Sequence, residues 1–324
     1  MPVLGRSDEF HPRLHCLVFL NIRYVYWRWD IVDLSEILSV QRTGPCSYKG
    51  ATGPAIGPRL FGGQAVAQAL LSAAAEESDG KLPHSLHAYF LRAGSSAVPV
   101  EYDVTPLSEG RSFAARRVEA RQGSATIFSM IASFHASESG FSHETPCAFD
   151  LDIEEAVASL DSWRAHNEAA GSLPVIDRLQ NRPIEIVPID PGSLFASRAR
   201  EPKTGVWMRM REPADSDPLL QRALLAYASD MMFLRNAMLP HAIRPGSSKV
   251  QAASLDHAIW FHTTPNFNNW HLFATESPWA GHARGLNRGH FYDLKGNMIA
   301  TVSQESLMRP QGEAAQELEL RAVR

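Results

Sequence analysis

The sequence predicts an α+β fold in which one plan, a long helix followed by antiparallel strands, occurs twice. Two helical segments, 64–77 and 217–238, are each followed by several segments with the composition of β-strands. Similar motifs recur in the two halves. SLHA (85–88) resembles SLDHA (254–258), and GRSFAARRVEA (110–120) resembles GHARGLNRGHF (281–291). The offset, roughly 170 residues, is too long for a solenoid repeat and indicates an internal duplication of a domain.

Composition limits the possible function classes. The chain has 324 residues, long for one domain, and its 44% hydrophobic and 20% charged residues are typical of a globular protein. A net charge of −4 and the absence of long Lys or Arg runs give no reason to expect a nucleic-acid partner. Cys16, Cys46 and Cys147 lie far apart, which favours a reducing compartment and excludes a CxxC site. The 13 histidines form no HExxH motif or obvious ligand cluster, so no metal site is predicted.

The N-terminal segment 11–29 is the least interpretable part of the chain. Its apolar run, 14–22, is too short to span a bilayer, and no signal-peptide cleavage site follows it. Three interpretations stay open: a membrane-surface anchor, an extra docking segment, or residues upstream of the true start. A short helix is expected from about Ile31 to Leu38, and the next readable structure begins at Arg59.

In the first half, Gly62 and Gly63 precede an alanine-rich helix at 64–77, against which another backbone can lie closely. Four strands are expected to follow as a meander, with turn residues between the later ones: 84–94, 100–106, 112–122 and 125–136. A polar connector at 137–146 and a helix at 153–170 lead to the second half. Its expected strands are 182–190, 205–211, 252–263, 269–277, 282–293 and 298–308.

The helix expected at 217–238 contains the most informative polar residue. Asp217 can cap this helix and Pro218 suits its first turn. The segment is apolar on nearly every face, which indicates burial against a sheet. Asp230 lies near its middle, and a buried carboxylate is costly unless it is hydrogen-bonded. Asp230 is therefore either a structural residue, solvated or bonded to a loop, or a catalytic carboxylate inside a pocket.

Common catalytic motifs are missing from the sequence. The nearest approach to the G-x-S-x-G of serine hydrolases, Gly110 to Ala114, lacks the last glycine, and no P-loop or G-x-G-x-x-G is present. Two polar residues stand in otherwise apolar strands, Ser254 and Gln304. Taken singly, such a residue usually has its hydrogen bonds satisfied by backbone.

Several ordered motifs give the chain, from about Trp29 to Pro310, a resemblance to the acyl-CoA thioesterase II family. They are RLFGGQAVAQAL (59–70), HSLHAYFLRAG (84–94), YDVTPLSEGRSFAARRVEA (102–120), YASDMMFL (227–234), SLDHAIWFH (254–262), ARGLNRGHFYD (283–293) and VSQESLMR (302–309). The resemblance implies a tandem hotdog fold, each half a long helix wrapped by an antiparallel sheet. The implied division is an N-terminal extension at 1–30, a first hotdog domain at 31–140, a linker with a helix at 141–181, a second hotdog domain at 182–310 and a tail at 311–324.

The resemblance also implies an activity and a site. It predicts hydrolysis of acyl-CoA, with Asp230, Ser254 and Gln304 as the catalytic residues and no cofactor or metal. The Phe, Trp and Leu content of the second half suits a medium or long acyl chain, although the same residues also suit an ordinary core. Asp230 would accept a proton from water that Ser254 and Gln304 orient, and backbone N–H groups near a helix start would stabilise the oxyanion. A covalent acyl-aspartate stays as a second route.

Two function classes other than thioester hydrolysis are compatible with a hotdog fold. A hotdog enoyl-CoA hydratase would need an Asp and a His in a short loop motif, which the adjacent Asp256 and His257 do not match. A non-catalytic acyl-CoA binding or scaffold protein would keep the fold without the chemistry. Arginines in the strands could meet the phosphates of coenzyme A or pair with acids such as Glu119 and Asp293; they are Arg116, Arg117, Arg284 and Arg288.

Partners and location complete the expectations. The expected partner is acyl-CoA, with no nucleic acid, no stable membrane insertion and a homo-oligomeric assembly. Peroxisomal relatives end in a tripeptide resembling Ser-Lys-Leu, whereas this sequence ends Arg321-Ala322-Val323-Arg324, so a cytoplasmic location is predicted.

Overall fold

The structure is a computed structural model that describes residues 33–52, 58–168, 182–195, 198–243, 247–312 and 315. The expectations for residues 1–30 and for Cys16 lie outside this part of the chain, as does most of the tail. None of the helices within it is long and apolar enough to cross a membrane.

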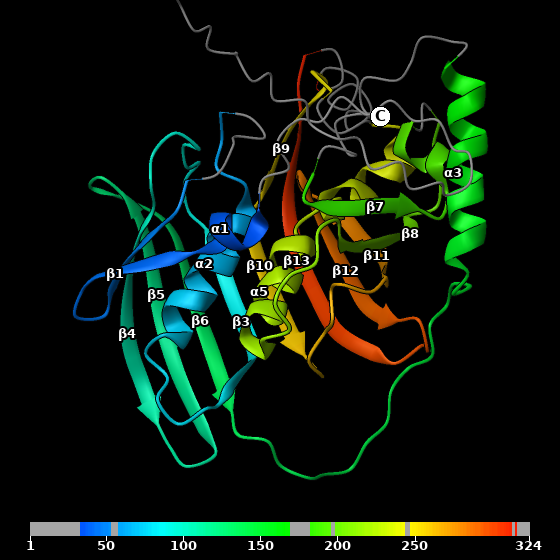
Figure 1. Ribbon diagram of the computed structural model, residues 1–324. Coiled ribbons are helices and arrows are strands. Elements are labelled where there is room, and N and C mark those ends of the chain that lie inside the picture. The colour runs from blue at the N-terminus through cyan, green and yellow to red at the C-terminus, as the bar shows by residue number, and fades with distance from the viewer. Residues whose placement is uncertain are drawn as a thin grey trace, which may run out of the picture. The chain divides into compact units, whose positions relative to one another are not determined.

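Strands dominate both halves of the chain. The first half contains β1 Val40–Gly44, β2 Ser47–Gly50, β3 Leu82–Phe90, β4 Glu101–Glu109, β5 Phe113–Gln122 and β6 Ala125–His135. The second half contains β7 Ile184–Pro188, β8 Lys203–Met210, β9 Val250–Ser254, β10 Asp256–Phe261, β11 His271–Gly281, β12 Arg284–Asp293 and β13 Met298–Pro310. Among the described residues these form one antiparallel sheet in the order β1-β2-β4-β5-β6-β3-β10-β13-β12-β11-β8-β7, with β9 paired to β13 (Figure 1). The two halves join where β3 pairs with β10, and the predicted α+β class is confirmed.

The order of the strands corrects the expected meander. β4, β5 and β6 do follow one another, but β3 pairs with β6 and not with β4. The second half repeats this arrangement, with β10 beside β13. Tight turns join β4, β5 and β6, whereas residues 91–100 form a longer connection that carries the chain across to the far side of β6.

Two further strand predictions need correction. The edge hairpin of β1 and β2 was missed because β1 buries none of its side chains completely and so shows no apolar alternation. The strand expected at 252–263 is two strands that meet at Leu255. The Leu255 N–H donates to the Glu305 carbonyl and the Leu255 carbonyl accepts from the Phe90 N–H, so the chain changes partner at this residue. Ser254 therefore lies at the end of β9.

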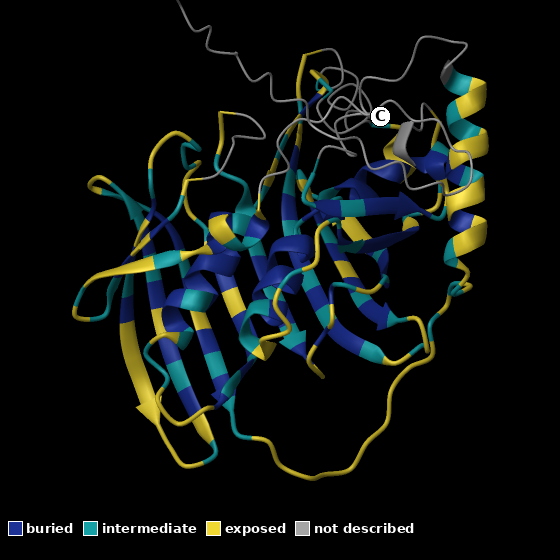
Figure 2. Ribbon diagram, viewed as in Figure 1, coloured by how far each residue is buried: buried dark blue, intermediate teal, exposed yellow. Residues whose placement is uncertain are grey.

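Two helices pack against each other in front of the sheet: α2 Gly62–Ala74 and α5 Pro218–Ser229. Figure 2 shows both as largely buried. A Cβ atom on Gly63 would lie 2.3 Å from the Tyr227 carbonyl oxygen, so only glycine permits this approach of the two backbones. The predicted start of α5 is confirmed, because the Asp217 side chain accepts a hydrogen bond from the Leu220 N–H at 2.8 Å and Pro218 lies in the first turn.

The end of α5 differs from the prediction of a helix to Met238. α5 ends at Ser229 with Asp230 as its C-cap, and a 3₁₀ helix, η2 Phe233–His241, follows. Met232 between them has a φ of 67°, a left-handed conformation that turns the chain. η2 packs on β11, β12 and β13, which requires the chain to leave the axis of α5. Asp230 therefore lies at a helix end and not in the middle of a helix.

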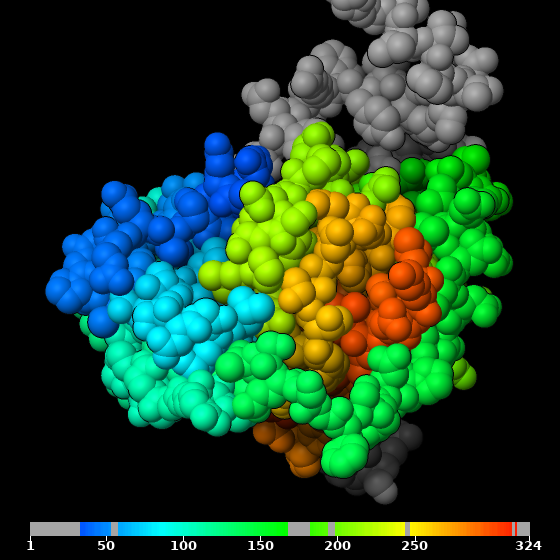
Figure 3. Space-filling view, turned by 60° about the horizontal axis from the view of Figure 1, so that its bottom comes forward, coloured from blue at the N-terminus to red at the C-terminus, as the bar shows by residue number. Residues whose placement is uncertain are grey.

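The remaining elements lie outside this helix pair. α1 Leu34–Leu38 packs on α2, and η1 Pro191–Phe195 follows β7. The expected connector carries the chain over the surface from the first half to the second (Figure 3) and leads to α3 Ile153–Glu168, as predicted. Ala156 and Leu160 of α3 pack with Trp207 and Leu272 of the second half. The boundaries assigned to the two hotdog domains stay a prediction.

Candidate active site

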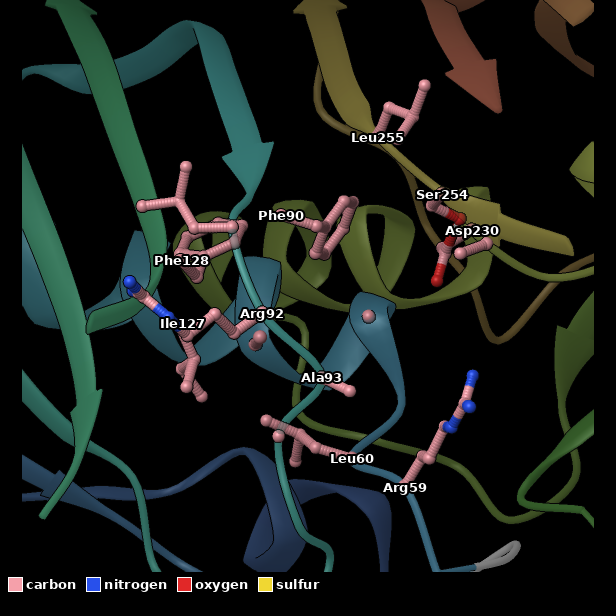
Figure 4. A pocket seen from close by; sticks show the side chains of 15 residues that line it. Arg59, Leu60, Phe90, Arg92, Ala93, Ile127, Phe128, Asp230, Ser254 and Leu255 are labelled. Atoms are coloured by element: carbon pink, nitrogen blue, oxygen red, sulfur yellow. Dashed lines mark hydrogen bonds between the residues drawn. The ribbon is translucent and has the colours of Figure 1, made fainter. Parts of the chain in front are cut away.

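A cavity of about 310 Å³ opens beside the N-terminus of α2 and the C-terminus of α5. It is lined by residues of both halves: Arg59, Leu60, Gly62, Ala65, residues 90–94, Ile127, Phe128, Asp230 and residues 253–255. Most of these side chains are apolar. Asp230 and Ser254 lie together at one end, and Phe90 and Phe128 line the remainder (Figure 4).

The Asp230 carboxylate lies between the ends of the two helices. The Gly63 N–H, in the first turn of α2, donates to Oδ2 at 2.9 Å, and the Ser254 hydroxyl donates to Oδ1 at 3.4 Å. The N-terminus of α2 carries the positive end of the helix dipole, which stabilises an anion. A Cβ atom on Gly62 would lie 2.6 Å from Oδ2, so the adjacent glycine leaves space for the carboxylate.

Burial controls the ionisation of this carboxylate. Loss of hydration raises the pKa of Asp230 to about 7, although hydrogen bonds from Gly63, Gln304 and Ser254 act in the opposite direction. With this pKa, the Asp230 carboxylate ionises near neutral pH and can then accept a proton. A general base is most effective when its pKa lies near the pH at which it works.

The structure brings the three predicted site residues together. Gln304, on β13, is 1% exposed, and its Nε2 donates to Ser254 Oγ at 2.7 Å. Ser254 in turn contacts Asp230. Gln304 is not one of the residues that line the cavity, but its amide donates to the Ser254 hydroxyl and also helps to lower the pKa of Asp230.

Sequence reasoning missed three polar contributors. The sequence places Gly63 only before a helix, whereas in the structure its N–H donates to Asp230 Oδ2. His257 and Ser229 lie behind Gln304: His257 Nδ1 is 2.6 Å from Gln304 Oε1, and His257 Nε2 is 2.8 Å from Ser229 Oγ. The available signal was the position of His257 in β10, where it shares the buried face with Ile259.

Three of the four strand arginines lie in ion pairs, with partners other than those expected. Arg116 is buried and pairs with Glu77 and Glu109. Arg284 pairs with Glu305 at 3.5 Å and Arg288 with Glu276 at 2.5 Å, whereas Arg117 is exposed. The arginines that line the cavity are Arg59 and Arg92, and in Figure 4 the Arg59 side chain extends toward the end at which Asp230 lies.

Among the described residues, the cavity lining includes neither a group of metal ligands nor an Asp–His pair. Within the described ranges, no group of three or more His, Cys, Asp or Glu side chains could hold a metal ion. His257 is fully buried and is not among the cavity residues, and the neighbouring Asp256 accepts a hydrogen bond from the Glu305 N–H at 2.7 Å.

Comparison with known proteins agrees with this architecture. Residues 181–307 match the family described as acyl-CoA thioesterase, and residues 51–135 match the acyl-CoA thioesterase N-terminal domain. The chain is 38% identical to acyl-coenzyme A thioesterase 8 of Mus musculus over 263 residues, 78% of this chain and 80% of that protein. It is 33% identical to acyl-CoA thioesterase 2 of Haemophilus influenzae over 284 residues, 86% of this chain and 98% of that protein.

A solved structure extends the likeness to the fold. The crystal structure of an acyl-CoA thioesterase II from Mycobacterium marinum superposes with a TM-score of 0.69 at 32% identity, and covers 86% of this chain and 98% of that one. The predicted tandem hotdog fold is thereby confirmed. Family models in both halves, relatives over most of the length and this shared fold agree, and the chain belongs to the acyl-CoA thioesterase II family.

Proposed function

We propose that the protein hydrolyses the thioester bond of medium- to long-chain acyl-CoA with water activated by Asp230. Membership of the family makes the chain a thioester hydrolase. The observation that carries the catalytic assignment is one carboxylate, with its pKa raised to about 7, at the end of an apolar cavity and against a helix N-terminus.

Each step of the reaction has a candidate group. Asp230 accepts a proton from water as the water oxygen attacks the thioester carbon, and the Ser254 hydroxyl orients that water with support from Gln304. The N–H of Gly62, at the start of α2 in the cavity, is suited to stabilise the oxyanion. Collapse of the tetrahedral intermediate breaks the carbon–sulfur bond, and the coenzyme A thiolate recovers the proton held by Asp230. General-base assistance of this kind contributes roughly 10²–10⁴-fold.

The lining of the cavity supports the substrate class. Leu60, Phe90, Ile127 and Phe128 present apolar surface to an acyl chain. A volume of about 310 Å³ is at the lower end of the range for small-molecule sites. Arg59 is exposed at the same cavity and could pair with a phosphate of coenzyme A.

Release of free thiol tests the proposal. A series of saturated acyl-CoAs of increasing chain length is incubated with the protein and a thiol reagent, without added metal or cofactor. We expect turnover that increases from acetyl-CoA to the medium and long chains. Arg59→Gln should raise KM for acyl-CoA more than for the corresponding acyl-pantetheine, which lacks the nucleotide phosphates. Absence of thiol release despite measurable acyl-CoA binding would contradict the proposal and favour a binding protein.

Assembly and location also remain proposals. We expect a homo-oligomer in the cytoplasm. Light scattering that shows only a mass near 35.8 kDa at micromolar concentration would contradict the first, and peroxisomal puncta from a reporter fused to this C-terminus would contradict the second.

A further inference from the structure

A row of buried hydrogen bonds continues from the candidate site into the core. Behind Asp230 and Ser254, it passes from Gln304 to His257 and then to Ser229. Ser229 and His257 are both fully buried, and Gln304 is 1% exposed. The row joins the strand pair β10 and β13 to the last residue of α5, directly before Asp230.

If every contact in the row is a hydrogen bond, only one assignment of donors and acceptors is possible. An ionised Asp230 can only accept, so Ser254 donates to it and must accept from Gln304 Nε2–H. The Gln304 carbonyl then faces His257 Nδ1, which must carry a hydrogen. In neutral imidazole the other nitrogen is bare, and it accepts from the Ser229 hydroxyl.

The environment of His257 supports a neutral ring. Burial lowers the pKa of His257 to about 4, although the hydrogen bond to Gln304 alone would raise it. The ring has an aromatic neighbour in Phe233, 6.3 Å away between centroids.

A second acceptor competes for the Ser229 hydrogen, because the Ala226 carbonyl lies 2.9 Å from Ser229 Oγ.

The other tautomer of His257 would require the side-chain amide of Gln304 to exchange the positions of its nitrogen and oxygen. If Nε2 of His257 carried the hydrogen, Nδ1 would accept, and the Gln304 amide would have to turn its nitrogen toward His257. Its carbonyl would then face Ser254 and draw the Ser254 hydrogen away from Asp230. The tautomer of a buried histidine, outside the cavity, thus determines whether the serine hydroxyl points to the carboxylate.

We propose that His257 is a positioning residue for the hydrolysis, which fixes the Gln304 amide so that Ser254 donates to Asp230, and that Ser229 selects the required tautomer. The inference rests on the proposed roles of Asp230, Ser254 and Gln304. His257 does not line the cavity, and its ring nitrogens bond to Gln304 and Ser229, so its loss should act on kcat and leave KM little changed.

Two amide substitutions separate positioning from packing. In His257→Asn the amide nitrogen falls near the place of Nδ1 and can still donate to Gln304. In His257→Gln the longer amide reaches toward the place of Nε2 and Ser229 and loses the Nδ1 donor. We expect kcat to fall roughly 10²-fold in His257→Gln and only about tenfold in His257→Asn. Equal losses in the two variants, a smaller loss in His257→Gln, or a rise in KM without a loss in kcat would overturn the proposal.

Serine substitutions cover the case in which both His257 variants fail to fold. Ser229→Ala removes the donor to His257 and should lower kcat severalfold at unchanged KM. Ser72→Ala is the matched control, since Ser72 is also fully buried on a helix but donates to the Gln68 carbonyl at 2.8 Å, away from the site. Equal kcat values for the two serine variants, measured below the melting temperature of both, would contradict the role of Ser229.

The tautomer itself is measurable without turnover. Two-dimensional ¹⁵N NMR of the ring nitrogens, with the His257 signals assigned as those missing from His257→Asn, should show a neutral ring with hydrogen on Nδ1 at pH 7. A hydrogen on Nε2 would overturn the inference whether or not the protein hydrolyses acyl-CoA. Absence of hydrolysis by the wild type, with the Nδ1 tautomer present, would instead count against the proposed function.

Discussion

The two central helices end differently, although the fold repeats. The C-cap of α5 is Asp230, which accepts a hydrogen bond from the N-terminal turn of α2, whereas the C-cap of α2 is Ala75. The strands next to these helices also carry different residues at corresponding positions. Alignment of residues 110–120 with 281–291 matches Arg116 with Asn287. Their partners on the next strand, Ala132 and Gln304, therefore correspond to each other.

The residue beside Ala132 in the first half, which holds the place that His257 holds beside Gln304, is also apolar. Leu86 pairs with Ala132 across β3 and β6, and both are fully buried. A row of buried polar groups is stable only if every member is hydrogen-bonded, so an apolar pair is the simpler way to fill the same place. The first half therefore contributes backbone N–H groups, apolar lining and the cavity arginines Arg59 and Arg92, whereas Asp230, Ser254 and Gln304 come from the second half.

The largest expected effect follows from changing the end of α5. Asp230→Asn keeps the size of the side chain but cannot accept a proton, so kcat should fall roughly 10²–10⁴-fold while acyl-CoA still binds. Asp217→Asn makes the same chemical change at the N-cap of this helix and should leave kcat unchanged, since Asn also caps well. Adding Ala75→Asp to the Asp230→Asn variant should restore no activity. Thiol release by the four proteins compares the two helix ends directly.

The same substitution should alter stability in a pH-dependent way. Burial raises the pKa of Asp230 in the folded state from 3.8 to about 7, so the folded wild type loses stability as pH rises from about 4 to 7. Asp230→Asn lacks this loss. Chemical denaturation should show equal stability near pH 4 and a gain of about 2–4 kcal/mol for the variant at pH 8. Lower stability of the variant at pH 8 would indicate a structural role for the charge.

Loss of the supporting polar groups should have smaller effects. Gln304→Ala and Ser254→Ala should each lower kcat less than Asp230→Asn does. The double variant should lose less than the product of the two factors, because both residues act on the same water. Replacement of the first-half counterpart, Ala132→Ser, should change stability without affecting kcat. Independent, multiplicative losses for Gln304 and Ser254 would contradict a shared role.

The contribution of the first half can be tested at Gly63. The methyl group of Gly63→Ala would meet the Tyr227 carbonyl oxygen, so the two helices must separate. We expect a loss of about 1–3 kcal/mol in the free energy of unfolding and a fall in kcat as the Gly63 N–H moves from Asp230. Gly140→Ala is the control, since its added methyl meets nothing within 4 Å. Thermal melts and thiol release by both variants would distinguish these outcomes.

The duplicated order of a helix followed by strands was predicted from the sequence, because hydrophobic patterns and turn residues are local signals. It did not predict that β3 lies beside β6, since neighbours in a sheet are chosen by tertiary packing. The group of Asp230, Ser254 and Gln304 was expected from the family resemblance, and the structure places the three side chains in one row. Gly63 and His257 were missed, because their partners are Asp230 and Gln304, distant in sequence and recognisable only once the helices and strands are packed.

The pH dependence of kcat/KM tests most directly whether Asp230 is the general base. The base acts in its ionised form, and its pKa is raised to about 7. For a medium-chain acyl-CoA, kcat/KM of the wild type should therefore rise about tenfold per pH unit up to pH 7 and become constant above it. Asp217→Asn should give the same curve. A wild-type profile that is flat between pH 5 and 9, with chemistry shown to be rate-limiting, would contradict the account.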